Sequence, residues 1–411
     1  MQETSNKYAV GIDIGTTNVR CVVGHIDNST GIPTVVGVGI TPNSGMRKGV
    51  VINLSGPAQA IDEALGEAER MSGYQIDAAA ISINGSHILS THADGMIAVG
   101  SPNHEINQED IARIEEVATL GKVPANREIL EVVPHSYKLD GQDIKNPIGM
   151  TGTRLEIDAH VVSVLVPYLS NLQKTSEIAK VFPRSVTVAG IAAARAVLNE
   201  NQIENGVALI DIGGATTNIA IYEEGDLQFS AVIPLGGVNI TNDLAIGLRT
   251  DPEIAEKIKI EHASAVSRHE SGSVNIKVND ESFDFKISEI DEIVEARLEE
   301  IFEAVNKELK RAGRAGKLPS GVVLTGGTAQ LKGIAEYAKE SLNLAVRIGK
   351  PSGYGGVADD IEKSQFATAV GLMLIDADTG GVTKRSSKNK TKKASSDREN
   401  ILIRLINRFK T

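Results

Sequence analysis

Two short segments of the chain carry the residue types that hold phosphate groups. Residues 11–20 read GIDIGTTNVR, and residues 209–220 read LIDIGGATTNIA. Each segment places an aspartate in an apolar run, followed by glycine and then by threonine hydroxyls. Glycine lets backbone N–H groups approach a phosphate closely, and hydroxyls add further donors. Together the two segments predict a cleft in which the phosphates of ATP are held from two sides.

The predicted nucleotide site extends beyond these two turns. Gly326 and Gly327 lie between an apolar strand and a helix, where a flat base or ribose can rest on the backbone. Glu256 and Lys259 share one helix face, and we expect them to reach the ribose and adenine; a surface salt bridge is the alternative. The complete predicted set is Gly15, Thr16, Thr17, Asn18, Gly213, Gly214, Ala215, Thr216, Thr217, Gly236, Gly237, Glu256, Lys259, Gly326, Gly327 and Thr328.

Asp13 and Asp211 provide the predicted metal site. Each stands near the end of the strand that enters its turn. Hard cations prefer oxygen ligands, and a carboxylate can hold Mg²⁺ through the water shell of the ion. Mg²⁺ bound through water is therefore expected beside the nucleotide. The eight histidines show no spacing typical of metal ligands.

The elements around these turns indicate a duplicated α/β fold. The two segments share Ile-Asp-Ile-Gly and Thr-Thr-Asn, with Gly214 and Ala215 extra in the second, and each reads as two strands around a turn. Such a recurrence predicts two similar domains that face each other. Two helices rich in Ala and Gly, at 189–198 and 366–374, have the small side chains that crossing hinge helices need.

Several helix boundaries can also be predicted. A helix is expected at residues 106–121. Asp251 and Pro252 are a typical helix start, with Pro at the first helical position. A hairpin at 273–288 turns at Asn-Asp, and Ser288 is predicted to cap the long helix that follows.

Composition narrows the class of protein. The chain has 411 residues and one cysteine, Cys21, so it has no internal disulfide and fits a reducing compartment. No apolar run approaches the roughly 20 residues that span a bilayer, and no signal peptide is recognisable. The net charge is −11, but residues 381–411 carry ten Lys/Arg against two acidic residues, which leaves −19 on the rest. The basic tail predicts an anionic partner.

The end of the tail has the pattern of an interfacial helix. Its apolar side chains fall on one side of a helical wheel and its basic ones on the other. Anionic membrane lipid is the expected partner, with a helix packed on its own protein body as the alternative. Nucleic acid is not expected, because the tail lacks the Tyr and Trp that stack on bases. The predicted membrane residues are Ile401, Leu402, Leu405, Ile406, Phe409, Arg404 and Arg408.

The motifs resemble those of the actin, sugar-kinase and heat-shock-chaperone superfamily. Within it, INGSHILSTHADG (residues 83–95) and EVVPHSYKLDGQDIKNPIGMTGTRLEIDAHVV (131–162) are similar to the inserted subdomain of the bacterial cell-division protein family FtsA. AEKIKIEHA, EARLEEIFEAV and VVLTGGTAQLKGI follow in that family's order, and the resemblance covers residues 8 to 375. It implies an actin-like α/β fold of two halves around a nucleotide cleft.

The resemblance and the sequence texture together predict the domain organisation. Residues 87–159 interrupt the first half as an α+β subdomain, and a small subdomain of the second half carries adenosine and FtsZ contacts. The predicted boundaries are 1–86 and 160–200 for the first half, 87–159 for the insertion, 201–240 and 303–378 for the second half, 241–302 for its small subdomain, 379–399 for a disordered basic linker and 400–411 for the membrane-targeting helix.

Two departures from the superfamily pattern predict weak or absent ATPase activity. The second turn usually reads Gly-Gly-Gly-Thr-x-Asp, whereas Ala215 and Asn218 stand here in place of a glycine and the carboxylate. A hinge helix usually begins near Glu-Pro, where this chain has Ala189 and Gly190. A group that positions the attacking water is one of the few parts that phosphoryl transfer requires. Binding rests on the turns and should remain.

The resemblance also implies partners. FtsA-like proteins form actin-like polymers, recruit the tubulin-like FtsZ polymer to the cytoplasmic face of the inner membrane at the division site, and contact later division proteins through the insertion. The FtsZ C-terminal tail would dock near Arg297; a solvated helix residue is the alternative for that arginine. An FtsA-like pilus-assembly ATPase and a sugar kinase remain as other functions of the same fold.

Overall fold

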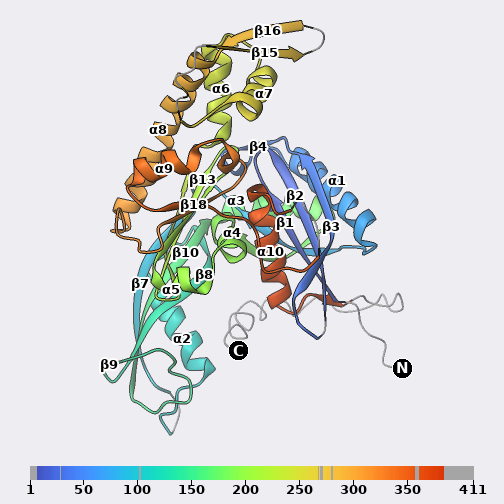
Figure 1. Cartoon of the computed structure of the whole chain (residues 1–411). Helices are drawn as coiled ribbons and strands as arrows, with labels where there is room; N and C mark the ends of the chain where they lie inside the picture. The colour runs from blue at the N-terminus through green and yellow to red at the C-terminus, as the bar shows by residue number, and fades with distance from the viewer. Residues whose placement is uncertain are drawn as a thin grey trace.

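The computed structural model describes residues 7–27, 29–100, 103–266, 268, 272–278, 281–356 and 361–383. Two large halves, each built on one central sheet, lie beside each other, and a smaller body extends from the lower part of the molecule (Figure 1). This is the predicted actin-like α/β architecture. The tail from residue 384 onward, with its predicted linker and helix, lies outside the described residues.

The first half is built on a sheet with the order β11, β6, β1, β2, β3. β1 and β2 form the first predicted hairpin, and β6 runs parallel to β1 on its other side. Helices α1 (Ser55–Ser72) and α3 (Val166–Ile178) lie side by side, and α1 packs on β2 and β3. The strands are β1 (Lys7–Ile14), β2 (Asn18–Ile26), β3 (Pro33–Pro42), β6 (Ala78–Ile83) and β11 (Phe182–Val188), beside a small ladder of β4 (Met46–Arg47) and β5 (Val50–Val51).

The second half repeats this plan. Its sheet has the order β14, β13, β12, β17, β18, in which β12 is antiparallel to β13 and parallel to β17. The predicted duplication is thus visible in the strand pairing. The strands are β12 (Val207–Ile212), β13 (Thr217–Glu223), β14 (Asp226–Ile233), β17 (Val322–Thr325) and β18 (Val346–Ile348), and the helices are α5 (Glu200–Asn205), α6 (Gly237–Gly247), α7 (Pro252–His262), α8 (Ile287–Arg311) and α9 (Ile334–Leu342), with short 3-10 turns η1 (Thr328–Gln330) and η2 (Ser364–Phe366).

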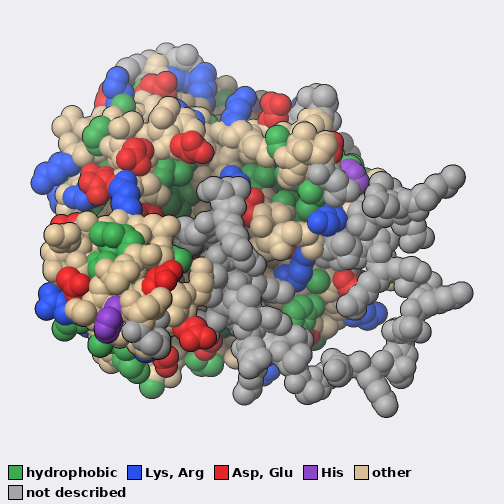
Figure 2. Space-filling model, turned by 90° about the horizontal axis from the view of Figure 1, so that it is seen from below, with side chains coloured by type: hydrophobic (Ala, Val, Ile, Leu, Met, Phe, Trp, Pro, Cys, Tyr) green, Lys and Arg blue, Asp and Glu red, His purple; other side chains and the backbone are tan. Residues whose placement is uncertain are grey.

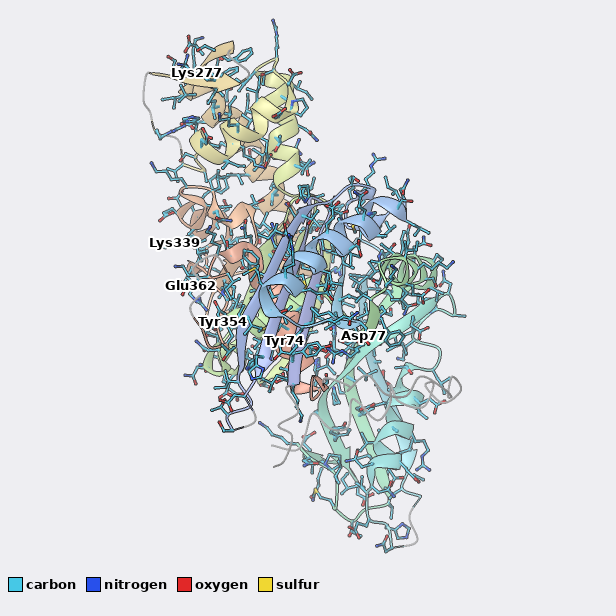
Figure 3. All side chains as sticks on the ribbon, turned by 90° about the vertical axis from the view of Figure 1, so that its right-hand side faces the viewer. Tyr74, Asp77, Lys277, Lys339, Tyr354 and Glu362 are labelled. Carbon is cyan, nitrogen blue, oxygen red and sulfur yellow. The ribbon has the colours of Figure 1, made fainter. Side chains whose placement is uncertain are left out.

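A hairpin closes the far end of the second half. β15 (Ser273–Val278) pairs with β16 (Glu281–Lys286), and the hairpin lies next to α6, α7 and α8 (Figure 1). Lys277 on β15 marks this tip, well away from Tyr74 and Asp77 in the first half (Figure 3). The apolar stripe of α8 is buried, as its helical spacing predicted.

The two hinge helices cross in close contact. α4 (Ala189–Val197) meets α10 (Ala367–Asp378) where Gly371 lies against the backbone of Ala192, so closely that a Cβ at this position would overlap the Ala192 carbonyl. Only glycine permits this separation. The prediction of small residues at a helix crossing is therefore confirmed.

The C-terminal part of the second half belongs elsewhere than predicted. α10 packs on β1, β2 and β6 of the first-half sheet, although residues up to 378 were assigned to the second half. β19 (Val382–Thr383) pairs with the start of β1, within a stretch predicted to be disordered. The sequence pattern of α10 shows only that it is buried, not which sheet buries it. The other domain boundaries remain predictions.

The insertion has its own sheet and core. Its strands β7 (Leu89–Ala98), β8 (Arg127–Leu139), β9 (Gln142–Ile144) and β10 (Arg154–Leu165) carry α2 (Gln108–Thr119), which Asn107 caps with a reciprocal capping box. The insertion also reaches the edge strand β14. Ser90 Oγ accepts a hydrogen bond from the backbone N–H of Ser230 at 3.0 Å, and His135 Nε2 lies 2.8 Å from the carbonyl oxygen of Leu227.

Two local predictions have different outcomes. α7 begins at Pro252 after Asp251, as expected, whereas α8 begins at Ile287, so Ser288 lies inside the helix and does not cap it. In the described part of the chain, none of the helices is both long and apolar enough to cross a bilayer. Seen from below, the surface shows acidic and basic side chains interspersed with apolar ones (Figure 2).

Candidate functional site

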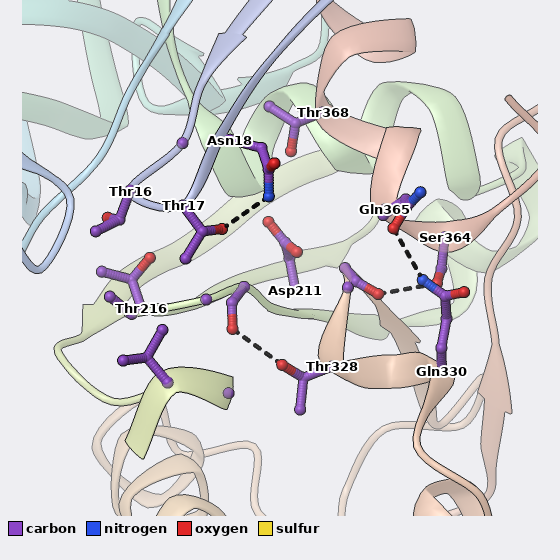
Figure 4. Close-up of a pocket in the computed structure, with 18 of the residues that line it drawn as sticks. Thr16, Thr17, Asn18, Asp211, Thr216, Thr328, Gln330, Ser364, Gln365 and Thr368 are labelled. Atoms are coloured by element: carbon purple, nitrogen blue, oxygen red, sulfur yellow. Dashed lines mark hydrogen bonds between the residues drawn. The ribbon is translucent and has the colours of Figure 1, made fainter. Parts of the chain in front are cut away.

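A cleft of about 480 Å³ lies where the ends of the two hairpins meet. The turn after β1 and the turn after β12 face it from the two halves, and the N-terminus of α6, α7, η1 and η2 complete its lining. Thr16, Thr17 and Thr216 gather on one side, with Asp211 at the centre and Thr328 and Gln330 on the other side (Figure 4). Its volume lies within the range of small-molecule and cofactor sites.

The cleft collects nearly all of the predicted nucleotide-binding residues. All of them line it except Thr217 and Gly236. The Thr217 hydroxyl is buried and donates to the carbonyl oxygen of Leu235 at 2.9 Å. A Cβ on Gly236 would press on the carbonyl oxygens of Gly213 and Gly214, so this glycine permits close packing of the backbone. These two residues support the turn and do not face the cleft.

The two turns are equal in length, contrary to the sequence alignment. Ile14 pairs with Val19 and Ile212 with Thr217, so residues 15–18 and 213–216 form matching four-residue turns. Each turn is closed by an equivalent hydrogen bond, in which the N–H of its first residue donates to the carbonyl oxygen of its fourth. Gly214 and Ala215 are therefore not an insertion. Arg20 in the first hairpin occupies the place of Asn218 in the second, since each stands opposite its aspartate.

The turns also contact each other across the cleft. A Cβ on Gly214 would lie 2.5 Å from Cγ2 of Thr17, so the second turn approaches the first as closely as a glycine allows. The first turn is fixed from its own side, because Thr16 Oγ1 accepts from the N–H of Gly49 at 3.0 Å and Asn43 Nδ2 donates to the carbonyl oxygen of Gly15 at 2.7 Å. The two turns therefore hold each other in place on one side of the cleft.

The charges inside the cleft do not balance. Burial raises the pKa of Asp13, against the opposing effects of the Arg20 guanidinium and a hydrogen bond from Ser82. Burial raises the pKa of Asp211 to about 7, and the nearby Asp13 charge adds to the effect. One guanidinium cannot neutralise two buried carboxylates when both are ionised. A cation at this place would therefore be favoured.

The residues present fit a hydrated Mg²⁺ and a polyphosphate. The Nε of Arg20 and the Oδ1 of Asn218 are buried atoms, and among the described residues neither has a hydrogen-bond partner. In the described ranges no group of three or more His, Cys, Asp or Glu side chains forms a metal centre. A cation here would therefore depend on water and phosphate oxygens in addition to the two aspartates.

The predicted departures are placed directly at the cleft. Asn218 Nδ2 donates to Asp211 Oδ2 at 3.3 Å, and Ala189 lines the cleft at the start of α4. Gly190 packs on Asn218, since a Cβ there would lie 2.8 Å from the Asn218 Cβ. An amide and a methyl group thus face the cleft at positions where carboxylates were expected from the superfamily, and neither can act as a base toward water.

Glu256 and Lys259 form the predicted salt bridge, but at the cleft. Lys259 Nζ lies 2.7 Å from Glu256 Oε2 and also donates to Thr241 Oγ1 and to the carbonyl oxygen of Gly237. Thr241 donates to the same Glu256 oxygen. The salt bridge expected as the alternative is therefore present, and it holds α7 to α6. Both side chains line the cleft, and their contact with ribose and adenine stays a prediction.

Several lining residues were not predicted. The register of the first hairpin was the available signal for Arg20, because a turn of four residues places it opposite Asp13. The others come from elements that only tertiary structure brings here, and no local motif marks them. They are Asn84, Val238, Ile240, Ile260, Gln330, Leu331, Ser364, Gln365 and Thr368.

This chain is similar to known proteins over most of its length. The model of the family "Cell division protein FtsA" matches residues 208–371, and that of the "SHS2 domain inserted in FTSA" matches residues 85–163. The cell division protein FtsA of Pseudomonas aeruginosa is 37% identical over 90% of this chain and 89% of its own length. The chain belongs to the FtsA family. FtsA of Bacillus subtilis (38% identical, 90% of this chain and 83% of its own) and of Escherichia coli K12 (33%, 91% of each) agree with this FtsA assignment.

Solved structures confirm the fold of this FtsA-family protein. The PilM-PilN type IV pilus biogenesis complex contains a chain with a TM-score of 0.65 at 16% identity, covering 90% of this chain and 98% of its own. MreB5 of Spiroplasma citri bound to ADP has a TM-score of 0.55 at 15% identity, covering 90% and 96%. At these identities the likeness shows the actin-like fold alone. The FtsA relatives, not the pilus protein, decide the family, and it is a family of cell-division proteins.

Substitution of Asp211 should make ligand-free stability less dependent on pH. An acid whose folded pKa is raised binds more protons when folded, so its contribution to stability falls as pH rises from about 4 to about 7. Asp211→Asn removes this term. Its midpoint of thermal unfolding should exceed that of the wild type most above pH 7, by the equivalent of at most about 4 kcal/mol, and the difference should shrink toward pH 4.

The matched control for this experiment is Asp62→Asn, which removes the same charge from an exposed position on α1. The control should leave the pH profile of the unfolding midpoint unchanged. A constant difference between wild type and Asp211→Asn from pH 4 to pH 8 would contradict the assigned cause.

Proposed function

We propose that this FtsA-family chain binds ATP with Mg²⁺ in the cleft between its halves. The observation that carries the proposal is the pair of equal turns that meet around two aspartates and one arginine. Thr16, Thr17 and Thr216 would donate to phosphate oxygens, with Arg20 supplying charge. Asp13 and Asp211 would hold the hydrated ion, which neutralises phosphate charge when bound. A relative of the same fold, MreB5, is known bound to ADP, which supports a nucleotide.

The same cleft is proposed to retain ATP with weak or absent turnover. Hydrolysis needs a group that orients or deprotonates the attacking water. Asn218 and Ala189 supply neither a carboxylate nor another base. Among the described residues, the carboxylates that line this cleft are Asp13, Asp211 and Glu256, and no described histidine lines it. Retained ATP would hold the halves together and so favour one shape of the molecule.

A bulky side chain at Gly327 should abolish ATP binding. Gly327 lines the cleft, has an ordinary right-handed helical backbone, and has open space where a Cβ would stand, so Gly327→Phe should fold and fill the site. Gly327→Ala is the matched control and should bind nearly as the wild type does. Titration with a fluorescent ATP analogue measures both, and the wild type should return the bound ATP unhydrolysed. Steady turnover that Asp13→Ala abolishes would contradict slow hydrolysis.

The tail is proposed to attach the protein to the cytoplasmic face of the inner membrane at the division site. This part rests on the sequence of residues 401–410, since they lie outside the described residues. One amphipathic helix binds a membrane weakly and reversibly. Copies held side by side in an actin-like polymer of this chain would bind firmly through effective concentration. Polymerisation and membrane binding would therefore reinforce each other.

Two acidic substitutions on the apolar face of the tail should release the protein from vesicles. Leu405→Glu with Phe409→Glu places charge on the face that enters the lipid, so co-sedimentation with anionic phospholipid vesicles should fall by roughly tenfold or more. Ser395→Glu with Ser396→Glu adds the same charge in the preceding linker and should reduce binding much less. Equal binding by both variants would reject the anchor. Point changes are preferable to truncation after Gly380, which also removes β19 from β1.

The second half is proposed to bind the C-terminal tail of FtsZ near Arg297, and the insertion to contact neighbouring copies and later division proteins. Arg297 is only one-fifth exposed and is paired with Asp243 through two bonds of 2.5 and 2.9 Å, and with Glu300. It is not a solvated helix residue. A carboxylate of a partner peptide would share the Arg297 guanidinium with Asp243 and Glu300, or would replace one of them as its partner.

Removal of Arg297 should weaken binding of an FtsZ C-terminal peptide. Arg297→Ala leaves Asp243 and Glu300 without their cation, and their charge then opposes an acidic peptide, so the Kd should rise by about tenfold. Lys307→Ala removes the same charge from an exposed position on α8 and should change the Kd by less than about twofold. Fluorescence anisotropy of the labelled peptide measures both variants. An unchanged Kd for Arg297→Ala would move the interface elsewhere.

A further inference from the structure

Two polar residues at the C-terminal end of β6, Ser82 within the strand and Asn84 just after it, contact the two hairpins that form the cleft. Ser82 is buried at 1% exposure, accepts from the N–H of Ile14 at 2.8 Å and donates to Asp13 Oδ1 at 2.9 Å. Asn84, two residues farther on, reaches the other half, where its Nδ2 donates to Thr216 Oγ1 at 3.0 Å. β6 belongs to the first half and Thr216 to the second turn, so this bond joins the two halves.

The orientation of the Asn84 amide is determined by its other bond. Its Oδ1 accepts from the N–H of Gly85 at 2.8 Å, which leaves the NH₂ group to face Thr216. The Thr216 hydroxyl is thus an acceptor on the side of Asn84. Its own proton must point elsewhere, and in the described part of the chain it has no other hydrogen bond. Thr216 is 4% exposed and lines the cleft, so the cleft is where that proton is available.

We propose that Asn84 is a positioning residue for the second turn. By donating to Thr216 it directs the hydroxyl proton toward the phosphate side of the cleft and ties the turn to the first half. This inference rests on the proposed binding of ATP. The contact of Gly214 with Thr17 brings the same two turns together by packing, whereas Asn84 does so by a directional bond.

Ser82 plays the corresponding part for the first turn. Its hydroxyl accepts from the backbone N–H of Ile14 and donates to the carboxylate of Asp13. This bond fixes the rotamer of that aspartate. Ser82 is the next-to-last residue of β6 (Ala78–Ile83), and Asn84 follows the strand directly. The C-terminal end of β6 therefore orients one side chain in each hairpin, Asp13 through Ser82 and Thr216 through Asn84.

A double-mutant cycle between Asn84 and Thr216 tests the inference. If Asn84 acts through the Thr216 hydroxyl, Asn84→Ala and Thr216→Val should each weaken binding of Mg-ATP by roughly three- to tenfold, the effect of one hydrogen bond. The double variant should bind within about twofold of Thr216→Val alone, because the hydroxyl that Asn84 orients is already gone. A role limited to general stability would instead give multiplied losses. Asn275→Ala, on the distant β15, is the control and should bind as the wild type does.

Asn84→Asp provides a second test should Asn84→Ala fail to fold. Its carboxylate keeps the shape of the amide but accepts, so it takes the Thr216 proton away from the cleft, and the loss of affinity should exceed that of Asn84→Ala. Multiplicative losses in the cycle, or wild-type affinity for Asn84→Ala, would overturn the inference while leaving ATP binding intact. Absence of Mg-ATP binding by the wild type would instead reject the proposed function, and the role of Asn84 with it.

Discussion

The burial of two aspartates beside a single arginine is the constraint on which the rest of the cleft depends. Arg20 stands opposite Asp13 in the first hairpin, and the meeting of the two halves places Asp211 near this pair. Removing carboxylates from water is costly unless opposite charge or hydrogen bonds replace the solvent. In the ligand-free cleft, burial raises the pKa of Asp211 to about 7 and so favours its neutral form. Protonation of Asp211 lowers the free-energy cost of keeping this side chain away from water. A bound cation would remove this need, so ligand binding and closure stabilise each other.

This electrostatic arrangement requires the backbones to approach closely, and glycines make that possible. A Cβ on Gly11 would overlap α10, and one on Gly39 would overlap α1, so both faces of the first sheet are covered at short range. Gly371 brings α10 onto α4 in the same way. With these helices so close, β1 and its turn have little freedom, and Asp13 is held where Arg20 and Ser82 reach it.

The sequence predicted those parts of the fold that depend on local pattern. The hairpins, α2, α8 and the site residues of both turns follow from periodicity and turn chemistry. Apart from the N-terminus of α8, the errors concern which segments pair or pack together. Alignment of the identical residues made Gly214 and Ala215 an insertion. The strand pairing instead gives two turns of equal length and places Thr217 in β13. Ser82 and Asn84 look like ordinary polar residues at a strand end, because their partners lie in segments that only the tertiary fold brings near.

The strand β1 connects the cleft with the origin of the tail. Its last residues carry Asp13 into the cleft, while its first residues, Lys7 and Tyr8, pair with β19, where the described chain ends. A strand of this length spans about 25 Å. If the residues beyond β19 bind a membrane, as proposed, the tail leaves the described protein at the end of β1 opposite to Asp13. The origin of the tail is therefore separated from the cleft by the length of β1, and a change in closure would reach that origin through β1 and the helices packed on it. Because α10 packs on β1 and crosses α4, those helices are the elements through which such coupling would have to pass.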